Sequence, residues 1–388
     1  MGKKGSTGII VMVSNSSWSL FNFRSGLIRK FLSHGLSVWV LAPRDHCTPA
    51  LQDMGVSFGQ LDVLPHGRHP LQELRLCWQL LRWYRLLRPN LILHYTIKPN
   101  IYGSVAAYGC GIPSIACVTG LGWLAKRGHR LRRGLAVLYA LGLTYSREVW
   151  FLNPADKALF VSRGMVAAEK SVVFPGEGID TGYFSPQGDG VPVGRQPVLI
   201  FAGRMLREKG LVELALAVRR LRADLPGLRV FLLGAIQPDH PGGLSIRQIR
   251  HWEAEGIFVF LGETDDVRPY LARADGLVFP SYREGLARIV MEASSMALPV
   301  VVADSVGCAE LVVEGVTGFL CRAGDVDSIE GAIRRLLALS VEERRAMGAA
   351  GRRHMQTFFG AEQVEEGYFN RIWRYFPALR SPQAISCS

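Results

Sequence analysis

Two glutamates, Glu284 and Glu292, stand eight residues apart where an apolar run gives way to a helical pattern. The run 276–279 predicts a strand, a short loop then carries Glu284 and Gly285, and a helix is expected to begin near Ala287. At 1.5 Å per helical residue the two carboxylates lie at most about 12 Å apart, comparable to a diphosphate with a hydroxyl-bearing ring at each end. A carboxylate can clamp a vicinal diol, and a helix N-terminus offers N–H groups to phosphates. Taken singly, each glutamate would be an ordinary solvated side chain.

Cationic side chains form the second candidate set. The run 198–201 predicts a strand, and Gly203, Arg204 and Lys209 follow its carboxyl end. Gly203 would let the backbone pass close to a ligand. Arg204 supplies a planar fork and Lys209 a point charge, both suited to phosphate oxygens. Arg207, between them, is interpreted as an ordinary surface cation.

Apolar runs alternate with helical patterns along the chain. The runs that predict strands are 9–13, 36–42, 91–94, 115–118, 149–152, 198–201, 230–233, 258–261, 276–279 and 300–303; the predicted helices are 20–32, 71–87, 131–143, 211–225, 287–296 and 329–339. Such strands predict parallel sheets covered on both faces. We therefore expect an α/β chain of two doubly wound, Rossmann-like domains, 1–190 and 191–360, facing a central cleft. Residues 361–388 are expected to form a helix and tail that pack back on the N-terminal domain.

Together these segments resemble glycosyltransferase family 4, whose members have the GT-B fold. The resemblance rests on the glycine-arginine and lysine-glycine pairs at 203–204 and 209–210, and on a proline-serine segment that leads into Glu284 and, eight residues on, Glu292. The stretches 307–310 and 318–320 also look like this family. Within the family, the chain is similar to bacterial undecaprenyl-diphosphate-linked N-acetylhexosaminyl and N-acetylgalactosaminyl transferases. The matching stretches are 23–24, 98–100 and 120–122 in the N-terminal half, and 260–262, 266–267 and 279–282 in the C-terminal half.

The resemblance implies a retaining, metal-independent hexosyltransferase with a nucleotide-diphosphate sugar donor, expected to be UDP-linked. The acceptor would be a lipid-linked saccharide, expected on undecaprenyl diphosphate, in the assembly of bacterial surface polysaccharide, O-antigen of lipopolysaccharide, or glycoprotein glycan. The expected catalytic residues are Glu284, Arg204 and Lys209. The expected donor-binding residues are Gly203, Gly285, Leu286, Ala287 and Glu292, and the acceptor or phosphate candidates are Arg24, Lys98, Asn100, Thr119 and Gly120.

Two other functions stay open at this point. A nucleotide-sugar 2-epimerase of the same fold would convert a donor without an acceptor, and a non-catalytic subunit would only bind sugar nucleotide. The paired glutamates argue against the epimerase. The presence of all four key side chains, Arg204, Lys209, Glu284 and Glu292, argues against the non-catalytic subunit.

The positive charge of the chain is concentrated in its first half. Residues 1–190 carry 21 Lys and Arg against 10 Asp and Glu, whereas residues 191–388 carry 24 against 23. The first half therefore predicts an anionic partner. No nucleic-acid-binding motif accompanies the charge, so we expect a phosphate-bearing substrate and an anionic membrane surface, not nucleic acid.

Basic residues beside tryptophan are typical of membrane-surface contacts. The membrane candidates are Trp123, Lys126, Arg127, Arg130, Arg132 and Arg133. The helix that carries Arg75 and Trp78 is equally compatible with a membrane contact and with a solvated basic face. No segment is long and apolar enough to cross a bilayer. We expect a cytoplasmic protein held peripherally at the inner face of the cell membrane.

Neither a metal nor another cofactor is expected. The seven cysteines are scattered and form no zinc-binding spacing. The sequence Asp325-Val-Asp327 looks like a metal-binding DxD motif, but Asp325 precedes a helical pattern and is expected to be its N-cap. His94 is expected to cap a strand.

Overall fold

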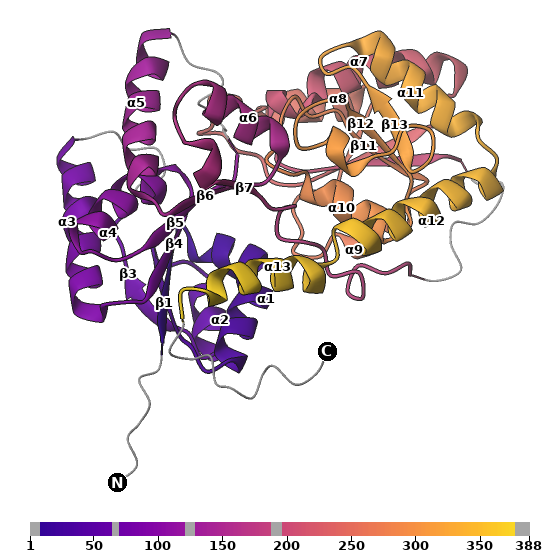
Figure 1. Ribbon diagram of the computed structural model, residues 1–388. Coiled ribbons are helices and arrows are strands. Elements are labelled where there is room, and N and C mark those ends of the chain that lie inside the picture. The colour runs from indigo at the N-terminus through magenta and orange to yellow at the C-terminus, as the bar shows by residue number, and fades with distance from the viewer. Residues whose placement is uncertain (1–7, 64–69, 121–128, 188–195, 377–388) are drawn as a thin grey trace, which may run out of the picture. The chain divides into compact units, whose positions relative to one another are not determined.

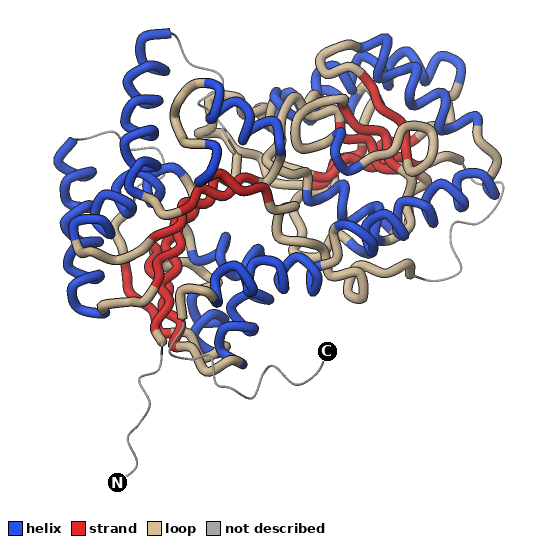
Figure 2. The backbone as a smooth tube through the Cα atoms, viewed as in Figure 1, coloured by secondary structure: helices blue, strands red, loops and turns tan. Residues whose placement is uncertain are grey.

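The computed structural model describes residues 8–63, 70–120, 129–187 and 196–376, and it divides the chain into two compact units. The first unit consists of residues up to Glu177 together with those from Glu362, and the second runs from Gly178 to Ala361. The transitions expected from the sequence were 190 and 360. Each unit has its own parallel sheet with helices on both faces, so the predicted pair of doubly wound α/β domains is confirmed (Figures 1 and 2).

The first unit is built on a seven-stranded parallel sheet in the order β3-β2-β1-β4-β5-β6-β7. Its strands are β1 (Ile9–Val13), β2 (Ser37–Ala42), β3 (Ser57–Gln60), β4 (Leu91–Tyr95), β5 (Ser114–Val118), β6 (Glu148–Phe151) and β7 (Ser171–Val173). Its α-helices are α1 (Ser17–Ser33), α2 (Thr48–Asp53), α3 (Pro70–Leu87), α4 (Ser104–Gly109), α5 (His129–Tyr145), α6 (Pro154–Ser162) and α13 (Ala361–Trp373). A short π-helical turn, Pro99–Gly103, leads into α4.

Alternate residues of β1 point to opposite faces of this sheet, as the two-residue period of a strand requires. Ile10 and Met12 pack with α1, α2 and α13, whereas Val11 and Val13 pack with α3 and α4. A further cluster joins α5 and α6 to β5 and β6. Helix α13 belongs to this core although it is last in the chain, because Val364, Tyr368 and Phe369 are buried against α1 and β6.

The second unit is built on a six-stranded parallel sheet in the order β10-β9-β8-β11-β12-β13. Its strands are β8 (Val198–Ala202), β9 (Arg229–Leu233), β10 (Val259–Phe260), β11 (Gly276–Phe279), β12 (Val300–Ala303) and β13 (Gly318–Cys321). Its α-helices are α7 (Leu211–Asp224), α8 (Ile246–Ala254), α9 (Arg268–Leu271), α10 (Arg288–Ser295), α11 (Val326–Ala338) and α12 (Val341–Phe358). Helix α7 packs beside α11, and α10 beside α12, on opposite faces of the sheet (Figure 1).

Asp325 is the N-cap of α11, as predicted. Its carboxylate accepts a hydrogen bond from the Ser328 N–H at 2.9 Å and pairs with Arg322. Both contacts hold the pKa of Asp325 below its usual value, the backbone hydrogen bond first. The capping role accounts for this aspartate without a metal ion.

His94 does not cap a strand; it lies inside β4 and is fully buried, which corrects the expectation. Its Nε2 faces the Tyr84 hydroxyl at 2.8 Å, and its Nδ1 faces the Ser104 hydroxyl, to which Ser146 donates at 2.9 Å. Burial lowers the pKa of His94 to about 3. The imidazole is therefore a neutral member of a buried hydrogen-bond chain.

Acid should destabilise the protein through His94. The unfolded imidazole takes up a proton below pH 6.5, but the folded one does not until about pH 3, so the free energy of unfolding falls as pH falls through this window. The loss due to His94 is roughly 3 kcal/mol at most between pH 6.5 and 4. Urea unfolding at several pH values should show a smaller loss in His94→Asn than in the wild type. Equal losses in the two proteins would contradict the assignment.

Candidate active site

The sheet of the second unit reverses its winding between β8 and β11. The chain runs outward from β8 to β9 and β10, then returns to β11 and continues through β12 to β13. In open parallel sheets ligands bind at the carboxyl ends of the strands beside such a switch point. The loops that follow β8 and β11 are the two that carry the predicted catalytic residues, Arg204 and Lys209 in one and Glu284 in the other.

Lys209 and Glu284 meet at this switch point, 75 residues apart in the chain. The Lys209 ammonium donates a hydrogen bond to Glu284 Oε1, and the Ser281 hydroxyl donates to the same oxygen at 2.5 Å. The Lys209 Nζ also lies 5.7 Å from the centre of the Phe279 ring. Only 9% of the Lys209 side chain is exposed, so its charge is held in a fixed position and weakly screened by water.

The loop that carries Glu284 is fixed by backbone hydrogen bonds on both sides. The Tyr282 N–H donates to the Glu208 carbonyl at 2.9 Å, and the Glu284 N–H donates to the Val306 carbonyl at 2.8 Å. The loops after β8 and β12 thus hold the loop after β11 in place by hydrogen bonds. Pre-organisation of this kind lets polar groups stabilise developing charge without a reorganisation cost at the time of reaction.

Two glycines permit this close approach of backbones. Gly210 has φ +72°, and a Cβ there would lie 2.3 Å from the Pro280 carbonyl oxygen. Gly307 has φ +81°, and a Cβ there would lie 2.5 Å from the Glu284 carbonyl oxygen. Any other residue would combine left-handed strain with displacement of the Glu284 loop. In the sequence, only the family resemblance points to Gly307.

Helix α10 begins at Arg288, one residue after the expected start. Its N-cap is Ala287, which has no side chain able to cap the first turn, so this helix end is chemically open to an anion. The Ala287 N–H itself donates to the Gly307 carbonyl at 2.7 Å and is not available to a ligand in this conformation.

Glu292 lies one turn further along α10 and is buried. Its Oε1 accepts a hydrogen bond from Arg288 Nε at 2.8 Å. Burial raises the pKa of Glu292, and the Arg288 charge opposes the rise. Because Arg288 occupies Oε1, Oε2 is the oxygen that could accept a hydrogen bond from a diol, and the sequence did not reveal this contact.

Arg204 is exposed at the same edge, and its side chain makes no hydrogen bond or ion pair with the described residues. A depression of about 440 Å³ lies beside the Glu284 loop, within the usual size range of ligand sites. Its lining is Tyr282, Asp304, Ser305, Val306, Ala309, Glu310 and Ala323. The switch-point edge therefore presents an exposed guanidinium, a buried ammonium and an adjoining hollow.

In the first unit Arg24 is buried among partners. Its guanidinium lies 3.2 Å from the Glu177 carboxylate and 4.8 Å from the centre of the Tyr95 ring, with Tyr368 of α13 also close. Burial alone would lower the pKa of Arg24, but Glu177 and the neighbouring groups outweigh it and hold the pKa above its usual value. These contacts account for Arg24 without a ligand.

The other acceptor candidates cluster around the end of β4. Lys98 pairs with Glu73 of α3 at 2.6 Å, and the buried Asn100 side chain donates to the Cys117 carbonyl and the Tyr139 hydroxyl. Thr119 and Gly120 follow β5 and are partly exposed. This edge lies beside the switch point of the first sheet, which falls between β1 and β4.

Thr96, which the sequence did not single out, lies at the same switch point in a strained conformation. Its φ of +71° is rare for a β-branched residue, and such strain persists mainly at functional positions. Thr96 Oγ1, Tyr95 Oη and Asn100 Oδ1 are buried and have no hydrogen-bond partner among the described residues. Strain of this kind leaves no signal in a single sequence, because threonine itself favours the opposite sign of φ.

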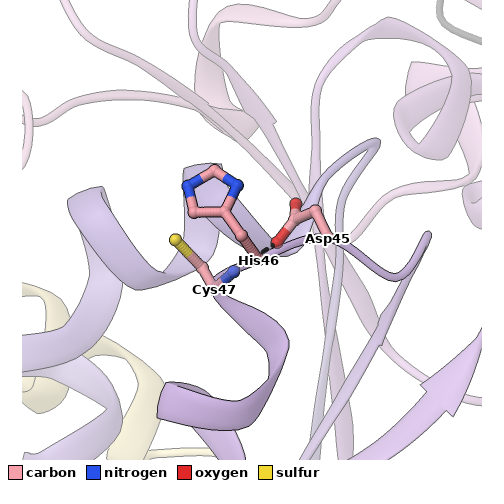
Figure 3. A group of neighbouring side chains, drawn as sticks. All are labelled: Asp45, His46 and Cys47. Carbon is pink, nitrogen blue, oxygen red and sulfur yellow. Dashed lines mark hydrogen bonds between the residues drawn. The ribbon is translucent and has the colours of Figure 1, made fainter.

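One Asp/His/Cys group among the described residues has ligand atoms close enough to share an ion. The side-chain atoms of Asp45, His46 and Cys47 lie within 4.8 Å of one another (Figure 3). However, the Asp45 oxygens already accept hydrogen bonds from the Trp18 and Cys47 N–H groups, at 2.7 and 2.9 Å. The aspartate closes a turn, and we assign no metal to it.

The predicted membrane cluster falls outside what the structure can describe. Trp123, Lys126 and Arg127 are not among the described residues, and the side chains of Arg130, Arg132 and Arg133 are not described either. Among the described helices, none combines the length and apolar character needed to cross a bilayer.

Both units of this chain are similar in sequence to known protein families. A glycosyl transferase 4-like domain model matches residues 24–177, and a model for glycosyl transferases group 1 matches residues 196–339. The chain is 24% identical over 343 residues to the N,N'-diacetylbacillosaminyl-diphospho-undecaprenol alpha-1,3-N-acetylgalactosaminyltransferase of Campylobacter jejuni, covering 84% of this chain and 89% of that one.

Two solved structures show the same fold over nearly the whole chain. A glycosyltransferase from Rickettsia africae has a TM-score of 0.77 at 13% identity, covering 96% of this chain and 99% of that one. The Anabaena protein HepE in complex with UDP and glucose has a TM-score of 0.76 at 18% identity, covering 94% and 98%. With both of its domains matched, this chain belongs to the glycosyltransferases of the GT-B fold, joining a glycosyl transferase 4-like domain to a group 1 glycosyl transferase domain.

Proposed function

We propose that this glycosyltransferase is a retaining, metal-independent enzyme of family 4. It transfers a hexose or N-acetylhexosamine from a UDP-sugar to a saccharide linked to a lipid diphosphate, in bacterial surface polysaccharide or glycan assembly. The observation that carries the proposal is the contact of Lys209 with Glu284 at the switch point, beside the open N-terminus of α10. The Campylobacter relative supports a lipid-linked acceptor, and the UDP-bound Anabaena structure supports the donor class.

Glu284 holds the transferred sugar in this mechanism. Its Oε1 is already occupied by Lys209 and Ser281, so the second oxygen is the one offered to sugar hydroxyls. The Lys209 charge lies beside this carboxylate at the switch-point edge, where the proposal places the diphosphate. The ammonium can therefore hold the Glu284 carboxylate in position for the sugar hydroxyls and also stabilise the charge that develops on the leaving phosphate.

Bond breaking and bond making occur on the same face of the sugar, as the resemblance to the retaining enzymes of family 4 implies. The bond from the anomeric carbon to the β-phosphate oxygen breaks, and the acceptor oxygen forms the new bond. The acceptor's proton passes to the departing phosphate oxygen. Arg204, Lys209 and the α10 N-terminus stabilise that leaving group, and Glu292 holds the ribose while its Oε1 stays paired with Arg288.

A panel of labelled UDP- and GDP-sugars tests the proposal when it is combined with undecaprenyl-diphosphate-linked mono- and disaccharides. Transfer should require one UDP-sugar and a lipid-linked acceptor, and the product should keep the anomeric configuration of the donor. Conversion of the donor without an acceptor would favour an epimerase. Donor binding with no turnover on any acceptor would favour a binding subunit.

Transfer should proceed at an unchanged rate in excess EDTA. The reason is that Lys209, Arg204 and a helix N-terminus supply the positive charge that a divalent ion provides in metal-dependent transferases. The rate is measured before and after chelation, with and without added Mg²⁺ or Mn²⁺. A rate that vanishes in EDTA and returns with either ion would contradict the metal-independent mechanism.

A further inference from the structure

Helices α3, α4 and α5 form one layer on a single face of the first sheet. They pack through their inner sides on the clusters around Val11, Ile92 and Phe151, and α4 contacts both α3 and α5 (Figure 1). Their outer sides face away from the sheet. Ten of the eighteen large apolar side chains that are exposed among the described residues lie on these three helices.

Apart from Thr144, the outer side of α5 presents apolar side chains in the part that the structure describes. Val137, Leu138, Leu141 and Tyr145 are 39–59% exposed and recur at helical spacing, while Tyr139 and Leu143 on the inner side are buried. No charged residue occurs from Gly134 to Tyr145. A soluble helix normally shows water its polar face, so this helix presents the reverse pattern.

The outer side of α3 interleaves apolar and cationic residues. Leu74 and Trp78 are 67% and 60% exposed, and Arg82 lies over the Trp78 ring at 5.8 Å. Arg85 is exposed on the same side, and the acidic residue of this helix, Glu73, is turned inward to Lys98. Aromatic rings beside exposed arginines are the pattern of surfaces that meet lipid headgroups.

Helix α4 makes the two outer sides continuous. Its Tyr108 is 65% exposed and contacts the ring of Tyr145 at 4.6 Å between ring centres, while α4 packs against α3 on its other flank. The exposed apolar side chains of the second unit are scattered over different elements, for example Leu216 on α7, Ile246 on α8 and Phe358 on α12. Scattered residues need no partner, whereas a contiguous patch does.

We propose that the outer side of α3, α4 and α5 is the surface by which this unit docks on an anionic bilayer, with the α5 side chains entering the headgroup region. The biological role of this docking rests on the proposed lipid-linked acceptor, whereas the surface itself is argued from the exposed side chains and the charge. The excess of positive charge in this half of the chain favours anionic lipid as the partner of this surface. Residues 1–190 carry 21 Lys and Arg against 10 Asp and Glu, and five of those cations, 126–133, immediately precede the apolar part of α5. A second copy would bring two such units together against their repulsion, whereas anionic lipid attracts both.

Vesicle flotation of the full chain tests the surface. The wild type should float with vesicles of phosphatidylglycerol and phosphatidylcholine and not with phosphatidylcholine alone. Val137→Gln with Leu141→Gln should weaken flotation at least about tenfold, because two apolar side chains no longer enter the interface. Leu216→Gln, a similarly exposed leucine on the other unit, is the matched control and should float like the wild type. High salt should weaken vesicle binding of the α5 variant more than that of the wild type, because the wild type is also held by its inserted apolar side chains.

The proposal would be overturned if the wild type did not float, or if the α5 variant floated as well as the wild type. It would also be overturned if the wild type formed a concentration-dependent dimer in sedimentation and the substitutions in α5 abolished that dimer. The last outcome would assign the patch to self-association. Transfer to a short-chain, water-soluble acceptor is measured in parallel. The α5 variant should retain it, so failure of transfer in every protein would count against the proposed reaction while leaving the flotation result intact.

Discussion

Lys209→Met is expected to lower kcat at least about 10²-fold. The methionine keeps an unbranched stem against the Phe279 ring but removes the buried charge that faces the leaving phosphate. Loss of one pre-organised donor of this kind typically costs 10² to 10³ in rate. Glu284→Gln should show a comparable loss, because an amide both weakens the clamp on sugar hydroxyls and gives up the ion pair with Lys209. Steady-state kinetics with saturating acceptor measures both.

Arg207→Met is the matched control for Lys209, since Arg207 is an exposed cation two residues away on the same turn. It should retain near-normal kcat. Glu292→Gln should chiefly weaken binding of free UDP, which calorimetry measures. Thermal unfolding of each variant separates catalytic loss from misfolding. Near-normal turnover in both Lys209→Met and Glu284→Gln would remove these residues from the reacting centre, and an equal loss in Arg207→Met would indicate a general effect of charge.

The second unit shows how far short-range patterns predict a site. The runs before Gly203 and Glu284 predicted two strands, and parallel strands place their following loops at one edge, so the approach of Lys209 to Glu284 follows from topology. The burial and pairing of the Glu292 side chain could not be predicted from these patterns. Its burial and its contact with Arg288 depend on how α10 packs, and the eight-residue spacing of Glu284 and Glu292 is the same whether the carboxylate is exposed or paired.

The first unit shows the opposite case. Helix α3 and strand β4 agree with the periodicity of the sequence, but the partners of Arg24 come from residues more than 70 positions away, Glu177 before the chain leaves this unit and Tyr368 after it returns. No local pattern carries that information. The same holds for the positive φ of Thr96, which is imposed by the surrounding structure against the residue's own preference.

Glu177→Gln is expected to destabilise the first unit by about 3 kcal/mol or more. The Arg24 and Glu177 side chains are 5% and 13% exposed, so the substitution leaves a guanidinium buried without its counter-charge. The double variant Arg24→Met/Glu177→Gln should recover much of this loss, because it removes the buried charge as well as its partner. Glu366→Gln is the control. It breaks the ion pair with Lys30, which joins α1 to α13, but Glu366 is 51% exposed, and such pairs contribute about 0 to 1 kcal/mol.

Urea unfolding of the wild type, Arg24→Met, Glu177→Gln and the double variant gives the coupling between Arg24 and Glu177 directly, with Glu366→Gln measured beside them. A double variant as unstable as the sum of the two single variants would mean that the pair is not an energetic unit, and a Glu177→Gln protein as stable as Glu366→Gln would mean that the Arg24 charge reaches water or another anion. Transfer activity then decides the role of Arg24. If the double variant recovers stability and keeps its rate, Arg24 acts through the fold, because a structural pair can be replaced by apolar packing. If stability recovers but the rate falls, Arg24 contributes its charge to phosphate, as the sequence suggested, and Glu177 holds that charge in place until a substrate arrives.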